Sequence, residues 1–89
     1  MFRVEWLQSA LDELAAVWVP AGSALRQAIT AAAHEAELQL QRNPEEEGKS
    51  RPRGDRVHFA LPLGINYEVE VESRTVVILH VWCIRPRRK

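Results

Sequence analysis

Hydrophobic and polar residues alternate over the first six positions of the chain. Phe2, Val4 and Trp6 are apolar, whereas Arg3 and Glu5 between them are charged. A period of two is typical of a strand that buries one of its faces. The pattern therefore predicts a short half-buried strand at the N-terminus.

After this strand the period changes to that of an α-helix. Apolar residues recur at spacings of three and four in a first stretch (Leu7, Leu11, Leu14, Trp18) and in a second one (Leu25, Ile29, Ala32, Ala36, Leu40). Such stripes are typical of helices that bury one face, and the intervening Ala, Glu, Gln and Arg residues favour helix. We expect a helical hairpin over residues 9–42.

The ends of the two predicted helices carry recognisable signals. Ser9 can cap the first helix, with Asp12 three residues later in a capping-box-like position. Pro20 interrupts the stripe, and Ser23 begins the second helix. Pro44 ends that helix because the residue before a proline is pushed out of the helical conformation.

The remainder of the chain predicts a charged loop and then strands. Residues 43–55 show no periodicity, whereas residues 56–61 and 67–72 alternate with a period of two. Pro62-Leu63-Gly64 and Ser73-Arg74 are expected to form the connections between strands. Residues 75–84 are almost wholly apolar and β-branched, as expected of a central strand.

These elements define an α+β fold with the order β-α-α-β-β-β. The N-terminal strand and the helical hairpin are expected to pack on one face of an antiparallel sheet. The length of 89 residues fits one domain spanning residues 1–89, with residues 85–89 as a basic tail. The single cysteine, Cys83, excludes an internal disulfide framework.

The alternation also predicts which side chains face away from the helices. If Val57, Phe59, Leu61, Tyr67, Val69, Val71, Val77, Leu79, Val81 and Cys83 face the helices, the opposite face carries Arg56, His58, Glu68, Glu70, Glu72, His80 and Trp82. We call this second face the open face of the sheet. A run of alternating glutamates is most often simply a solvated face, and glutamates repel phosphate.

The charge is distributed unevenly. The net charge is zero, but residues 1–47 sum to −5 and residues 48–89 to +5. The asymmetry reflects either a polyanion-binding surface or merely which segments are solvated. On the first reading, RNA contacts come from Lys49, Arg51, Trp82, Arg87 and Arg88, because guanidinium groups pair with phosphate and an exposed tryptophan stacks on a base.

The same residue types could support RNA cleavage without a metal. That reaction needs a base for the 2′-hydroxyl, an acid for the leaving oxygen and cations for the charged transition state. The candidate catalytic residues are Arg53, Arg56, His58, His80 and Arg85, with Glu68 or Glu70 as a further proton carrier. His34, His58 and His80 do not form a metal-binding motif, and no cofactor is expected.

Several segments together resemble the RelE/ParE superfamily of toxins from bacterial type II toxin–antitoxin systems. They are FRVEWLQSALDELAAVW at the start, QRNP after the second helix, the basic loop before a strand, and GINYEVEVESRTVVILHVW near the end. The resemblance covers about residues 2–84. It implies a metal-independent endoribonuclease acting on ribosome-associated mRNA, or a non-enzymatic ParE-like inhibitor of DNA gyrase, or a diverged member that only binds its antitoxin.

The resemblance also bears on partners and site residues. It implies a cognate antitoxin and a hetero-oligomer formed with it, by packing of an amphipathic helix or by addition of a strand. The basic positions of the ribonuclease branch correspond to Lys49, Arg51, Arg53 and Arg56. Two features of that branch are missing from this sequence: residues 64–67 carry no arginine, and no terminal tyrosine or histidine follows Arg87. No signal peptide or membrane span is recognisable, so the expected location is the cytoplasm.

Overall fold

The computed structural model describes residues 1–45 and 54–84 and the backbone of residues 49–50. The elements are β1 (Arg3–Trp6), α1 (Gln8–Trp18), α2 (Ser23–Arg42), β2 (Lys49–Ser50), β3 (Arg56–Ala60), β4 (Leu63–Glu70) and β5 (Thr75–Cys83). The described strands form a sheet in the order β1-β5-β4-β3-β2, where β1 runs parallel to β5 and the other neighbours are antiparallel. The predicted α+β class and element order are confirmed, but β1 joins the sheet as a parallel edge strand instead of packing on its face, and the short β2 was not expected.

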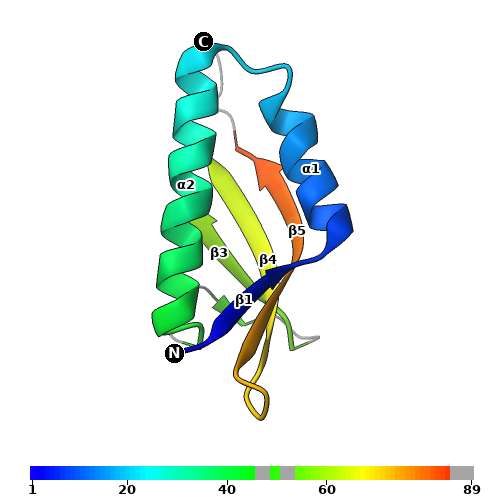
Figure 1. The fold of residues 1–89 in the computed structure, drawn as a ribbon, viewed down its shortest axis with the longest axis vertical. Helices are drawn as coiled ribbons and strands as arrows, with labels where there is room; N and C mark the ends of the chain where they lie inside the picture. The colour runs from blue at the N-terminus through cyan, green and yellow to red at the C-terminus, as the bar shows by residue number, and fades with distance from the viewer. Residues whose placement is uncertain (46–48, 51–53, 85–89) are drawn as a thin grey trace.

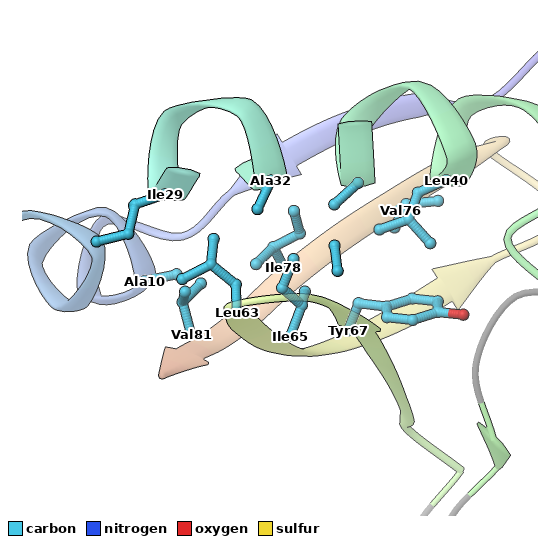
Figure 2. Packing of buried hydrophobic residues seen from close by; sticks show 12 residues of the cluster. Ala10, Ile29, Ala32, Leu40, Leu63, Ile65, Tyr67, Val76, Ile78 and Val81 are labelled. Carbon is cyan, nitrogen blue, oxygen red and sulfur yellow. The ribbon is translucent and has the colours of Figure 1, made fainter. Parts of the chain in front are cut away.

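Both helices lie against one face of the sheet, and the core fills the space between the two layers (Figures 1 and 2). The helices contribute Ala10, Ile29, Ala32, Ala36 and Leu40, and the sheet contributes Ala60, Leu63, Ile65, Tyr67, Val76, Ile78 and Val81. The i, i+3, i+4 stripe of α2 is thus the face that is buried, as its sequence predicted. Full burial of each larger aliphatic side chain contributes about 1.5–3 kcal/mol.

The first helix begins differently from the prediction. It starts at Gln8, its N-cap is Leu7, and no side chain caps it. The amide of Leu7 donates a hydrogen bond to the carbonyl of Ile78 (3.0 Å), so the chain passes from β1 straight into α1 while still held by β5. Ser9 therefore lies inside the first turn, and the predicted Ser9 cap is wrong.

The connection between β3 and β4 is shorter than predicted. β4 begins at Leu63, so Leu63 and Gly64 belong to the strand and the turn is confined to Leu61 and Pro62. Leu63 is completely buried, which anchors the start of the strand in the core. Burial of this side chain outweighs the turn preference of the Pro-Leu-Gly sequence.

The orientation of β3 is opposite to the predicted one. His58 and Ala60 are buried beneath the helices, whereas Phe59 is 56% exposed. Ala60 is small enough to lie under a helix, and the imidazole Nε2 of His58 is 2.8 Å from Oε1 of Gln39 on α2. A buried polar group with such a hydrogen-bond partner avoids the desolvation penalty that would otherwise exclude it from the core.

A β-bulge changes the phase of β5. Tyr67 pairs with Ile78, but the preceding residue Asn66 pairs with His80, so Leu79 is the extra residue. A bulge of this kind leaves one residue out of the ladder and bends the strand.

The bulge determines which residues of β5 face the core. Val76 and Ile78 are buried before the bulge, and Val81 is buried after it. The prediction that Val77 faces the helices is wrong, and the prediction for Val81 is correct. A single uninterrupted alternation of inward and outward side chains therefore cannot describe both halves of β5.

None of the helices in the described part of the chain has both the length and the apolar character needed to span a bilayer.

Candidate nucleic-acid interface

The open face of the sheet is organised in rows of side chains that cross β3, β4 and β5. One row contains Phe59, Gly64 and Trp82, because Gly64 pairs with both of the others. The next row contains Asn66 and His80 with Val57. These rows lie near the end of the sheet where β3 and β5 both finish.

Trp82 and Phe59 form the aromatic end of the open face. Their ring centroids are 6.4 Å apart and their planes meet at 86°. A Cβ added to Gly64 would lie 2.3 Å from Cε2 of Trp82, so the indole crosses directly over this glycine. Trp82 is 37% exposed, as predicted for a side chain on the open face.

His80 lies in the neighbouring row, beside a carboxylate from α1. Its Nδ1 is 3.3 Å from Oε2 of Glu13, and both side chains are substantially exposed. The other oxygen of Glu13 accepts a hydrogen bond from the backbone amide of Val81 (3.0 Å). Glu13 therefore contacts the β5 edge and the imidazole at the same time, and the His80 side chain stays 60% exposed.

Asn66 connects β4 to the segment that precedes β3. Its Nδ2 donates to Oδ2 of Asp55 (2.5 Å) and to the carbonyl of Arg56 (3.1 Å). Asn66 is 8% exposed, so these bonds hold the start of β3 in a fixed place relative to β4. The last residues of the basic loop consequently enter the sheet at a defined point.

The opposite end of the open face is acidic. Glu68 and Glu70 on β4 are exposed there, where they pair with Val77 and Thr75 of β5. A cavity of about 210 Å³ lies along this part, lined by Gly54, Glu68, Val69, Glu70 and Val77. Carboxylates at its rim make it unsuitable for a phosphate, so the candidate interface is the aromatic end. Glu72 lies beyond β4 in the turn to β5.

Two predicted site residues do not lie on the open face. His58 points toward α2, as its bond to Gln39 shows, and Arg56 pairs with the core residue Tyr67 and so follows the same alternation. The predicted placement of Arg56 and His58 is wrong because the phase of β3 is reversed. His80 and Trp82 lie where they were expected.

The other predicted site residues are outside the described part of the chain. They are Arg51, Arg53, Arg85, Arg87 and Arg88, together with the side chain of Lys49. The chain continues directly from Ile84 into this basic tail, and the amide of Ile84 donates to the carbonyl of Pro62 (2.7 Å). Ile84, the last described residue before this tail, therefore lies at the end of the sheet that carries Trp82 and Phe59.

Sequence reasoning did not find three residues of this surface. Phe59 was assigned to the core, Gly64 to a turn and Glu13 to no role. The alternation gave the wrong signal for Phe59, because its apolar side chain indicates the buried set of β3 whereas the structure exposes it. Within the described residues, no group of three or more histidine, cysteine, aspartate or glutamate side chains is arranged to hold a metal ion.

Comparison with known proteins gives a result only at the level of structure. No protein-family model and no curated protein matches this chain. A chain of the toxin–antitoxin complex RelBE2 from Mycobacterium tuberculosis superimposes with a TM-score of 0.72 at 24% identity, over 92% of this chain and 96% of that chain. For the isolated RelE toxin of E. coli the TM-score is 0.65 at 15% identity, over 98% of this chain and 88% of that chain.

The ParE branch matches in a similar way. A chain of the chromosomal ParDE system of P. aeruginosa has a TM-score of 0.62 at 18% identity, over 96% of this chain and 98% of that chain. The fold is therefore that of small toxins of toxin–antitoxin systems. In particular, it is the RelE/ParE fold across nearly the full chain, which confirms the structural part of the resemblance.

Proposed function

We propose that this protein is the toxin of a type II toxin–antitoxin system and that it cleaves ribosome-associated mRNA without a metal. The observation that carries the proposal is the open sheet face, where His80 and Trp82 are exposed beside the point at which the basic tail begins. The nearly full-length structural match to the RelE toxin supports the toxin role.

The chemistry needs proton transfer and stabilisation of negative charge. The 2′-oxygen of the substrate attacks the adjacent phosphorus while its proton passes to a base. The bond from phosphorus to the 5′-oxygen then breaks, and that oxygen takes a proton from an acid, which leaves a 2′,3′-cyclic phosphate and a 5′-hydroxyl. His80 is the proton carrier that the described residues offer for one of these transfers.

Arginine side chains would stabilise the charge that develops on the phosphate. We assign this role to Arg53 and Arg85, because guanidinium groups pair with phosphate oxygens in a bidentate manner. Lys49, Arg51, Arg87 and Arg88 would hold the RNA backbone. His58 is left out of the proposed site because its imidazole faces the helical layer.

The antitoxin is proposed to bind the other side of the molecule. The helices α1 and α2 enclose a groove of about 340 Å³ lined almost wholly by apolar side chains, namely Leu11, Leu14, Ala15, Trp18, Ile29, Thr30 and Ala33. Leu11 is 42% exposed there. Since residues 1–47 carry a net charge of −5, the occupant we expect is an amphipathic antitoxin helix with basic flanks.

Expression in bacteria tests the proposed activity. The chain is induced with and without the neighbouring antitoxin gene, protein synthesis is followed, and the 5′ ends of mRNA are mapped. We expect arrest with new ends inside translated codons, and rescue by the antitoxin. The variant His80→Ala should form these ends at least about a hundredfold more slowly, because a positioned acid or base contributes about 10²–10⁴-fold.

His34→Ala is the matched control, because His34 is an exposed histidine on α2 away from the open face. It should arrest translation like the wild type. Arrest without new mRNA ends but with gyrase-dependent DNA breaks would contradict the ribonuclease proposal and identify the ParE-like alternative. Absence of arrest, with antitoxin binding intact, would leave only the diverged, inactive member.

A further inference from the structure

The aromatic end of the open face has a shape that its two rings create together. The indole of Trp82 and the ring of Phe59 are nearly perpendicular, at 86°, with centroids 6.4 Å apart. Phe59 is 56% exposed and Trp82 is 37% exposed. The two rings thus form a step, and each ring is partly open to solvent.

Gly64 fixes this step in place. It pairs with Phe59 on β3 and with Trp82 on β5, and the indole covers the position that a Cβ would occupy. The indole can rest on the backbone of β4 only because this residue has no side chain. Trp82 is therefore held before any ligand arrives, which reduces the entropy lost on binding.

We propose that Trp82, Phe59 and Gly64 form a stacking site for one unpaired base of single-stranded RNA. The inference rests on the proposed function and deepens it. Stacking of bases on exposed aromatic rings is the usual mode of recognition for single-stranded nucleic acid, and the two perpendicular rings fit the face and the edge of one planar base.

The sequence that follows the site favours a nucleic acid over another apolar partner. Ile84 is bonded to the Pro62 carbonyl at this end of the sheet, and a tail with four basic residues in five positions follows it directly in the sequence. The exposed Glu68 on β4 is four residues from Gly64, which corresponds to about 13 Å along a strand. The acidic end is thus separated from the stacked base by several side chains.

The experiment measures binding of a short fluorescein-labelled single-stranded RNA to the purified full chain. The RNA carries 2′-O-methyl groups so that it is not cleaved, and a second series replaces each base in turn by an abasic nucleotide. For the wild type, loss of the stacked base should raise the Kd about 5- to 150-fold. Trp82→Leu should raise the Kd for the intact RNA by a similar factor.

The decisive result is the combination of the two changes. In Trp82→Leu the abasic nucleotide should cause no further loss, because the two changes remove the same contact. Trp82→Phe should retain most of the affinity, and Phe59→Leu, at an exposed position, should lower it in a chain that folds normally. Leu38→Ala, an exposed apolar residue of α2, is the control and should bind like the wild type.

Two outcomes overturn the stacking site. Trp82→Leu and Phe59→Leu could bind the intact RNA like the wild type, or the abasic nucleotide could cost Trp82→Leu as much as it costs the wild type. If RNA binding is unchanged and the substitutions abolish self-association in sedimentation, the rings belong to an interface between copies. None of these results alters the mapping of mRNA ends, so failure of the stacking site and failure of the proposed function are distinguishable.

Discussion

At the scale of single residues, Tyr67 joins the sheet to the segment that follows α2. Its ring is completely buried in the core, and its hydroxyl donates a hydrogen bond to the carbonyl of Pro44 (2.7 Å). Pro44 is itself among the fully buried residues. The bond thus satisfies a carbonyl that water does not reach, at the point where the chain leaves α2 for the basic loop.

Tyr67→Phe should lower the free energy of unfolding by about 1–3 kcal/mol, because it leaves the buried Pro44 carbonyl without its donor. Urea denaturation measures the change, and the m-value should stay the same. Ser73→Ala is the control, since the Ser73 hydroxyl bonds the Glu70 carboxylate at an exposed site (2.9 Å). Unchanged stability of Tyr67→Phe would show that the hydroxyl makes no net contribution.

Residue identity alone could not orient β3. Its apolar residues Val57 and Phe59 read as the buried set, yet His58 and Ala60 are the ones beneath the helices. The choice depends on Gln39 of α2, which supplies the partner for His58. That contact joins positions 19 residues apart in the sequence, so no local pattern contains it.

At the scale of elements, the interaction between α1 and β5 closes an open strand edge. β1 pairs with β5 only as far as Ile78, and among the described residues no other strand lies beside the later part of β5 on that side. Glu13 of α1 takes the place of the missing strand by accepting a hydrogen bond from the Val81 amide. An unpaired edge is a template for unwanted pairing, and a charged side chain directed at it prevents this.

Glu13→Ala should lower stability by about 1 kcal/mol and speed hydrogen exchange of the Val81 amide about fivefold, since its acceptor is removed. Glu13→Gln keeps an oxygen acceptor and should retain most of the protection. Asp12→Ala is the matched control, because the Asp12 carboxylate accepts a hydrogen bond from the side chain of Gln8 on the exposed surface of the same helix (2.9 Å). Equal exchange rates at Val81 in all the variants would contradict this role for Glu13.

The helices and strands themselves were largely predictable from the sequence. The side chains of each strand that face the core were not. The stripe of α2 and the alternation of β4 each satisfy one period throughout, so sequence and structure agree there. β5 is apolar at almost every position, and its bulge at Leu79 exchanges the two faces midway. The direction of Trp82 agrees with the prediction because it depends only on the half of β5 after the bulge.

At the scale of the whole molecule, the two halves of the sequence differ in net charge. The segment 1–47, which contains both helices, has a net charge of −5, and the segment 48–89, which contains the antiparallel meander, has a net charge of +5. A polyanion is attracted to the second segment and repelled by the first. The proposed antitoxin groove is formed by the helices, and the proposed RNA face is the face of the sheet that the helices leave open, so each can be changed without the other.

This separation makes the groove between α1 and α2 testable on its own. Leu11→Glu places a charge in the apolar groove and adds to its negative surroundings. We expect antitoxin affinity to fall about 10- to 150-fold, the loss that corresponds to one buried leucine of about 1.5–3 kcal/mol. Pull-down of the antitoxin and rescue of growth on co-expression measure the effect, and translation arrest by the variant alone should equal that of the wild type.

Leu38→Glu is the matched substitution outside the groove, because Leu38 is 40% exposed on α2 and Leu11 is 42% exposed on α1. Both variants add one negative charge, so a general electrostatic effect would weaken the antitoxin equally in the two. Loss confined to Leu11→Glu identifies the groove as the docking surface. If the antitoxin instead neutralises both variants as well as it neutralises the wild type, its binding site is a strand edge or the open face. On the open face it would compete with RNA for Trp82.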